Sequence, residues 1–256
     1  MTSPPCAISL PARAMITLTG ADSFAFLQRI VTQDMTRLDA QPLIYAALLS
    51  GQGKFLYDMF IHRPAPDTYV IECEGGDQAA ALLKALTLYR LRAKLAFALD
   101  DNVPVWAILG SDDGLPDPRH NSLRRTYQPV PHLLDRPFTL YDRARIALAL
   151  PDGRRDSIPG QSTLAELNID TLAADFSKGC YVGQELTARI HHRGLLKRCL
   201  TPLRFAQEPP AFGMDIVGAD GQVLGDMRSS TCDIGLACLK IAALDQLPAH
   251  INRLPA

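Results

Sequence analysis

Short apolar runs alternate with helical patterns through the first half of the chain. Apolar residues recur at helical spacing after Thr19-Gly-Ala-Asp-Ser23, in which Asp22 or Ser23 can cap a helix. A stretch rich in alanine and leucine predicts a second helix over 77–89. Runs of β-forming residues predict strands over 14–18, 43–49, 55–61, 68–73, 95–99 and 105–109. The turn Gly51-Gln-Gly53 between two of these runs favours a β-hairpin.

The second half changes from loops and helices to strands. The segment 110–119 is rich in proline, glycine and aspartate, so we predict a loop and a candidate domain boundary there. Helices are predicted over 141–150, before Pro151, and over 183–193, before the C-cap residue Gly194. Short strands between turns over 197–240 predict a small β-barrel or sandwich. Helices mixed with short strands predict an α+β fold.

Composition narrows the class of protein. The chain has 256 residues, of which 47% are hydrophobic and 21% charged, as expected for one large or two to three small folded domains. A net charge of -1 gives no long-range attraction for nucleic acid, so no direct nucleic-acid partner is expected. No apolar run approaches the roughly 20 residues of a membrane span, so no membrane partner is expected either.

The cysteines and the N-terminus indicate a reducing compartment. Met1-Thr-Ser-Pro-Pro-Cys6 lacks the basic and apolar regions of a signal peptide, so we expect a cytoplasmic protein. The six cysteines are then expected to be free thiols. None belongs to a C-x-x-C pair, so no metal site is expected. Cys232 and Cys238 lie in predicted strands and are expected in the core.

The segment Phe176-Ser-Lys-Gly-Cys-Tyr-Val-Gly-Gln-Glu-Leu-Thr-Ala-Arg189 carries the most distinctive chemistry. Lys178 precedes Cys180 by two residues, and a helix N-terminus is predicted near Gly183. Both features favour a thiolate, so Cys180 and Lys178 are the candidate catalytic residues. Gln184 and Glu185 offer amide and carboxylate groups that suit the edge of a heterocycle such as a pterin.

Each of these residues also has a structural interpretation. An arbitrary cysteine is most often a small buried hydrophobe, although the flanking lysine and glycines favour function for Cys180. Glu185 and Arg189 are spaced as an i,i+4 ion pair, and on spacing alone this solvated pair explains Glu185 as well as ligand contact does. His191 and His192 are adjacent on a helix and point in different directions, which favours surface histidines over a metal pair.

The run Lys178-Gly-Cys-Tyr-Val-Gly-Gln-Glu185, with Ile158-Pro159, Ala188-Arg189 and Arg193-Gly194, resembles the signature of the YgfZ family. That family is related in fold to the T-protein, the aminomethyltransferase of the glycine cleavage system. Weaker agreement covers Gly20-Ala-Asp22 with Phe26-Leu-Gln28, Thr32-Gln-Asp34, Gln52-Gly-Lys54, Asp58 and Tyr89-Arg-Leu-Arg-Ala-Lys94.

The resemblance implies a three-domain ring around a central hole that accepts tetrahydrofolate or a derivative. The expected domains are 1–45 with 118–192 for folate binding, 46–117 as a second α+β domain, and 195–256 as a C-terminal β-barrel. The family's functional lysine and cysteine match Lys178 and Cys180. The cofactor would contact residues drawn from the motif and from the hairpin: Tyr181, Gln184, Glu185, Arg189, Lys54 and Asp58.

The resemblance also implies a function: an accessory role in the assembly or repair of iron–sulfur proteins, with indirect effects on tRNA modification. Iron–sulfur proteins or assembly factors would be partners, and no classical enzymatic turnover is expected. The alternative is a folate-dependent aminomethyltransferase. Lys54 replaces the arginine usual in the family, and Tyr57-Asp58 replaces the paired aspartates of the T-protein. Because methylene transfer needs a base or charged partner at the folate nitrogen, the single carboxylate favours the accessory role.

Overall fold

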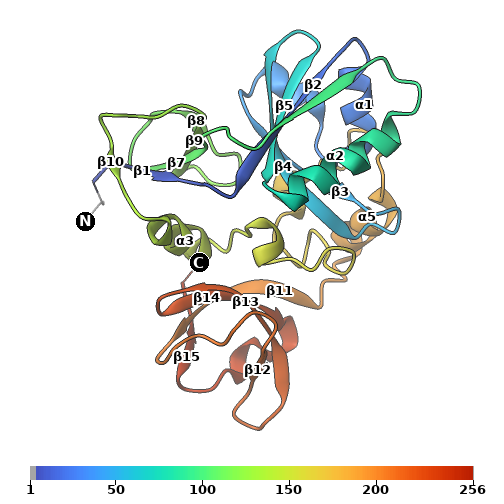
Figure 1. Ribbon diagram of the computed structural model, residues 1–256. Coiled ribbons are helices and arrows are strands. Elements are labelled where there is room, and N and C mark those ends of the chain that lie inside the picture. Colours follow the sequence, from blue (N-terminus) through green and yellow to red (C-terminus); the bar gives the residue numbers. More distant parts are fainter. Residues whose placement is uncertain (1–3, 256) are drawn as a thin grey trace. The chain divides into compact units, whose positions relative to one another are not determined.

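The computed structural model describes residues 4–255, which fold into two compact units (Figure 1). Unit 1 and unit 2 are each built from three stretches of chain: Met1–Leu49, Leu56–Phe138 and Leu172–Gln184 for unit 1, and Ser50–Phe55, Thr139–Thr171 and Glu185–Ala256 for unit 2. Helices and antiparallel sheets occur in both units, which confirms the predicted α+β class. The three domain ranges expected from the family resemblance stay a prediction.

Unit 1 contains a five-stranded sheet in the order β3-β4-β5-β2-β6. Its strands are β2 (Arg13–Thr19), β3 (Ile44–Leu49), β4 (Phe55–Ala65), β5 (Thr68–Glu74) and β6 (Ala96–Asp100). β3 and β4 are neighbours, as the glycine turn between them predicts. Alternation along β5 directs Tyr69, Ile71 and Cys73 into the apolar core of the unit.

Two helices accompany this sheet. α1 (Ser23–Ile30) directs Phe26, Leu27 and Ile30 into the core, and α2 (Asp77–Arg90) lies against β2, β5 and β6 (Figure 1). Asp22 stands at the N-cap of α1 but makes no capping bond with its side chain. Its carboxylate instead accepts the Lys94 N–H at 2.6 Å, so it fixes the segment after α2.

The second sheet of unit 1 has the order β10-β1-β7-β9-β8. Its strands are β1 (Cys6–Ser9), β7 (Trp106–Leu109), β8 (Leu115–Pro116), β9 (Leu123–Thr126) and β10 (Leu134–Asp135). Of these, the sequence pattern predicts β7 alone. The predicted loop over 110–119 contains β8, which pairs with β9 through Leu115 and Pro116.

Unit 2 ends in a five-stranded sheet in the order β12-β13-β14-β11-β15 (Figure 1). Its strands are β11 (Arg198–Phe205), β12 (Asp215–Val217), β13 (Val223–Thr231), β14 (Ile234–Lys240) and β15 (Ile251–Arg253). Leu203, Leu224 and Leu239 form part of its apolar core. Cys238 is buried as expected, but the expectation for Cys232 is wrong, because it lies exposed in the turn between β13 and β14.

The remaining helices are short. They are η1 (Met35–Asp39), α3 (Phe138–Ala147), η2 (Gly153–Arg155), α4 (Asp170–Ala173), α5 (Gln184–Arg193) and η3 (Ile241–Gln246). α3 begins three residues before the predicted position, and α5 agrees with the prediction to within one residue. Within residues 4–255, no helix combines the length and apolar character needed to cross a membrane.

Candidate functional site

The segment that leads into the signature motif is held against the residues that follow α1. The Thr32 hydroxyl donates to the carbonyl oxygens of Ala47 and Ala173, and the Gln33 amide donates to the carbonyl of Leu172 at 2.9 Å. The Asp175 N–H donates to the Thr32 carbonyl at 3.0 Å. Thr32 and Gln33, from the family-like run Thr32-Gln-Asp34, therefore hold the chain just before Lys178, and we call these contacts the clamp.

Asp175 adds side-chain contacts to this clamp. Its carboxylate accepts the backbone N–H and the hydroxyl of Ser177, and it pairs with Arg37 at 2.8 Å. The Ser177 hydrogen bonds, together with the Arg37 charge, outweigh burial and lower the pKa of Asp175 to about 2. The carboxylate is therefore ionised throughout the physiological pH range. Its bonds to Ser177 and Arg37 hold the bend at 175–177 in place.

Lys178 reaches back into the same clamp. Its ammonium donates to the carbonyl oxygens of Val31 and Gln33, each at 2.7 Å, and lies 5.4 Å from the centroid of the Tyr181 ring. Burial lowers the pKa of this lysine to about 8. These contacts make Lys178 a positioning residue for the motif, and its support of the Cys180 thiol by charge stays a prediction.

Cys180 is exposed and free, which excludes the interpretation of this residue as a buried hydrophobe. The preceding Gly179 has φ +94°, a conformation that side chains rarely adopt. The glycine thus allows the chain to turn outward immediately after the lysine that anchors it. The outcome is an accessible thiol on a fixed bend, four residues before α5 begins.

Tyr181 points the other way and is 7% exposed. Its hydroxyl is buried with no hydrogen-bond partner among the described residues. Burial raises the pKa of the phenol to about 12, so the group is a neutral donor and acceptor at physiological pH. A buried hydroxyl without a partner is uncommon in folded proteins and marks a place where a ligand can supply the missing bond.

The predicted ligands on α5 are solvated. Gln184 begins the helix and is partly buried, and its N–H donates to the Tyr181 carbonyl at 3.3 Å. Glu185 and Arg189 form an ion pair at 2.7 Å, with side chains 87% and 49% exposed. This is the i,i+4 pair expected from spacing, and the contact of either residue with a cofactor stays a prediction.

The two predicted residues of the hairpin have different surroundings. Lys54 is partly buried in the turn between β3 and β4, where its N–H and C=O bond to Ser50. Asp58 is buried on β4 and accepts the Tyr45 hydroxyl at 2.8 Å. Burial, reinforced by this carboxylate, raises the pKa of Tyr45 well above its usual range. Asp58 is therefore held by a neutral phenol.

Next to Asp58, unit 1 contains a group of buried charges that the sequence pattern missed. We call it the charge cluster; it consists of Arg13, Glu72, Asp117, Arg119 and Arg125, all at most 7% exposed. Glu72 on β5 accepts Arg13 at 2.8 Å and Arg125 at 2.5 Å, and Asp117 accepts Arg119 at 2.8 Å and Arg125 at 3.2 Å. The Phe60 ring lies 3.7 Å from the Arg125 guanidinium carbon.

The charge cluster joins the two sheets of unit 1, because Glu72 comes from one sheet and Arg125 from the other. Burial opposes ionisation of Asp117, but Arg119 and Arg125 outweigh it and lower its pKa to about 2. The signal available in the sequence was a glutamate at an internal strand position, within Thr68–Glu74. Its burial depends on partners more than fifty residues away.

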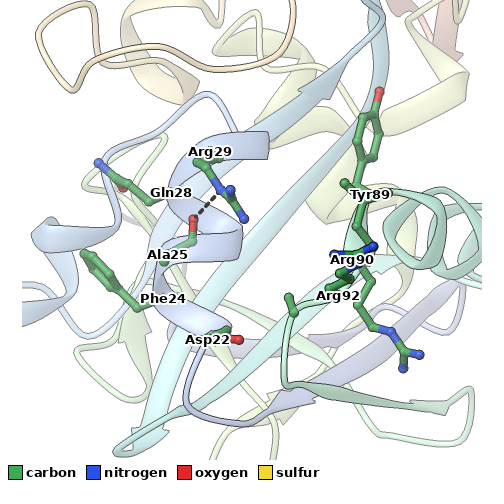
Figure 2. Close-up of a pocket in the computed structure, with 10 residues that line it drawn as sticks. Asp22, Phe24, Ala25, Gln28, Arg29, Tyr89, Arg90 and Arg92 are labelled. Carbon is green, nitrogen blue, oxygen red and sulfur yellow. Dashed lines mark hydrogen bonds between the residues drawn. The ribbon is translucent and has the colours of Figure 1, made fainter.

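A separate cavity of about 840 Å³ lies in unit 1 between α1 and the C-terminal end of α2 with the residues that follow it (Figure 2). Figure 2 shows Gln28 and Arg29 on α1 and, across from them, Tyr89 and Arg92. Two segments that resemble the YgfZ family, one at α1 and one over 89–94, thus line the same cavity. None of the predicted catalytic or cofactor residues lines this cavity.

No group of three or more histidine, cysteine, aspartate and glutamate side chains within residues 4–255 is placed to hold a metal ion. His191 and His192 meet edge to face at 5.3 Å, and His191 bonds to Asp170 at 3.2 Å. Both histidines are exposed on α5, as the sequence predicts.

Comparison with solved structures identifies the fold. The crystal structure of glycine cleavage system aminomethyltransferase T from Bartonella henselae superposes with a TM-score of 0.76, covering 95% of this chain and 80% of that one. The sequences are 12% identical, so the match shows the fold alone. Residues 197–255 match the family model described as CAF17, C-terminal beta-barrel domain, which confirms the predicted C-terminal barrel.

Comparison with curated sequences identifies the family. The iron–sulfur cluster assembly factor IBA57 of Homo sapiens is 30% identical over 90% of this chain and 76% of its own length. The IBA57 homolog of Coccidioides immitis is 33% identical over 85% of this chain, which spans 62% of that relative. The mouse protein is 29% identical over 95% of this chain and 79% of its own length.

These relatives also correct one expectation. All three are mitochondrial proteins by name, so the comparisons point to mitochondria and overturn the cytoplasmic location inferred from the N-terminus. The names of these relatives are also more specific than the resemblance to the YgfZ family. The chain belongs to the IBA57 family of iron–sulfur cluster assembly factors.

Proposed function

We propose that this protein acts as a tetrahydrofolate-binding accessory factor in the assembly or repair of iron–sulfur proteins, with Cys180 as its working thiol. The observation that carries the proposal is the contrast within three residues: Lys178 is anchored by two carbonyl oxygens while Cys180 is exposed and free. A thiol held in this way can meet a partner protein without rearrangement of the backbone. Its partners would be iron–sulfur proteins or assembly factors, as the names of the relatives indicate.

A folate fits the chemistry of Tyr181, which is adjacent to this thiol, and of Asp58 in the same unit. The buried Tyr181 hydroxyl lacks a partner among the described residues and can bond to a polar atom of the ligand. Asp58 offers a carboxylate within unit 1, and carboxylates pair well with the adjacent donors of a pterin. Bound tetrahydrofolate would supply a carrier for one-carbon groups, while this chain orients it and presents the thiol.

Effects on tRNA modification are proposed to be indirect. Enzymes that contain iron–sulfur clusters would lose activity when their clusters are not assembled or repaired. The net charge of -1 supports an indirect route, since it gives no general attraction for RNA.

Calorimetry with tetrahydrofolate tests the folate part of the proposal. The wild-type chain should bind it saturably, and Tyr181→Phe should weaken binding at least several-fold. The same variant should be more stable in the free state by about 1–3 kcal/mol, because it removes a buried hydroxyl without a partner. Tyr89→Phe, at a tyrosine that is 37% exposed, is the matched control and should change neither quantity.

Two results would overturn the folate proposal in different ways. Absence of saturable binding would leave an assembly factor that works without folate. Turnover of an aminomethyl donor in the presence of tetrahydrofolate would instead assign the protein to the transferases.

A further inference from the structure

A second cavity, of about 430 Å³, lies in unit 2, outside the residues considered so far. Three arginines, two serines and a phenylalanine line it, and none of the lining residues is acidic: Arg154, Arg155, Phe212, Arg228, Ser229 and Ser230. We call it the arginine pocket. Its volume falls within the range of small-molecule sites, roughly 300–1,000 Å³.

Arg228 is the central residue of this pocket. It lies on β13 and is 5% exposed, and its Nη2 donates to Asp226 at 2.7 Å. Its Nε and Nη1 are buried and have no hydrogen-bond partner among the described residues. The Phe212 ring faces the guanidinium at 5.7 Å and stabilises its charge, but a ring face cannot satisfy N–H groups that point along the guanidinium plane.

The carboxylate that pairs with Arg228 also pairs with a second arginine. The other oxygen of Asp226 accepts a bond from Arg198, so one carboxylate serves two guanidinium groups. The negative charge of Glu166 also stabilises the Arg198 guanidinium. Burial of a cation with two unpaired donors and a shared counter-ion costs free energy, and an approaching anion would offset that cost.

The floor of the arginine pocket is rigid. Asp156 accepts the backbone N–H and the hydroxyl of Ser229 at 3.1 and 2.6 Å, and it pairs with the fully buried Arg145 at 2.5 Å. At the rim, Arg155 is held by Asp142 at 2.7 Å and by Asp152 at 3.0 Å. The donors of the pocket are thus positioned before any ligand arrives, which lowers the cost of binding.

We propose that the arginine pocket binds the phosphate group of a small phosphate ester that also carries a planar ring. Guanidinium groups match the geometry of phosphate oxygens and bind them in a bidentate manner. The volume leaves room for an organic part beyond the phosphate. Phe212 is 52% exposed and offers a flat apolar surface on which a ring can stack. This site lies in unit 2 and does not depend on the proposed folate site in unit 1.

Titration of the full chain with AMP, adenosine and inorganic phosphate, followed by calorimetry, tests the proposal. AMP should bind saturably and at least tenfold more tightly than inorganic phosphate, and adenosine should not bind. Arg154→Gln and Arg228→Gln should each weaken AMP binding at least tenfold. Phe212→Ala should weaken AMP binding and leave phosphate binding unchanged.

Arg204→Gln is the matched control, because Arg204 is an exposed arginine of β11 that pairs with Asp233 at 3.3 Å and does not line the pocket. It should leave AMP binding unchanged. Arg154 is exposed, so its variant keeps the test valid even if Arg228→Gln fails to fold. The proposal is overturned if AMP does not saturate, if adenosine binds as well as AMP, if phosphate binds as tightly as AMP, or if Arg204→Gln weakens AMP binding as much as Arg154→Gln.

Discussion

The motif bend, which comprises residues 175–180, and the charge cluster both belong to unit 1 and both concentrate polar chemistry, yet they are built in opposite ways. In the charge cluster, Glu72 and Asp117 are enclosed and paired with arginines. In the motif bend, Lys178 and Asp175 form hydrogen bonds with backbone groups, and the sulfur of Cys180 remains exposed and free.

This difference separates a structural role from a functional one. Buried charges that satisfy one another hold two sheets in a fixed relation, and none is accessible to a partner. A bend whose charged residues bond to backbone groups is equally well fixed, but it leaves one reactive group exposed. Perturbation of the first region should therefore cost stability, and perturbation of the exposed group in the second should cost function.

The largest effect on stability is expected at Glu72. Glu72→Gln removes the carboxylate that Arg13 and Arg125 share and leaves their buried charges without this partner. We expect a loss of about 3–5 kcal/mol in the free energy of unfolding, measured by urea denaturation. Asp67→Asn, at an exposed loop carboxylate, is the control and should stay within about 0.5 kcal/mol of wild type. Equal effects of the two variants would contradict a structural role for the charge cluster.

A smaller effect, visible in its pH dependence, is expected at Lys178. In the unfolded chain this lysine holds its proton up to about pH 10.5, whereas the folded chain releases it near pH 8. Between these values the unfolded state binds more protons, so the lysine makes the folded state progressively more stable as pH rises. The stability of wild type relative to Lys178→Met should thus increase from pH 8 to pH 10, measured by denaturation at a series of pH values.

Lys84→Met, at an exposed lysine of α2, provides the reference for this series. Its stability relative to wild type should be constant over the same range. If Lys178→Met behaved in the same way, the lysine would not be partly buried in the clamp.

The smallest effect is expected at the exposed ion pair of α5. Glu185→Gln breaks a pair whose side chains are 87% and 49% exposed, and such pairs contribute roughly 0.3–0.5 kcal/mol. Thermal unfolding should shift by no more than about 1–2 °C. A loss of tetrahydrofolate affinity in this variant, measured by calorimetry, would show that Glu185 contacts the cofactor; a loss of stability above about 1 kcal/mol would contradict the solvated arrangement.

Local patterns predicted much of this molecule. The run of β-forming residues over 68–73 predicted β5, and the lysine, cysteine and glycines of the motif predicted a bend with an accessible thiol. These features depend on residues that are close in sequence. The same holds for the Glu185–Arg189 pair, whose spacing is a property of one helix.

Features that depend on distant partners were missed. Glu72 is buried because Arg13 and Arg125, which are distant in sequence, pair with it. No local sequence pattern predicts such a contact. The hydrogen bonds that Lys178 donates to the carbonyl groups of Val31 and Gln33 were not predicted, because these residues lie far from it along the chain. Cys232 was expected in a strand interior, yet the turn after β13 exposes it.

The central claim, that the exposed thiol of the motif bend performs the function, is tested most directly by complementation. Cells that lack the protein would receive wild type, Cys180→Ala or Cys232→Ala, the last being an exposed cysteine of unit 2. The activity of iron–sulfur enzymes would then be measured at equal levels of folded protein. We predict that Cys180→Ala restores no activity while Cys232→Ala restores it fully. Full restoration by Cys180→Ala would contradict the account.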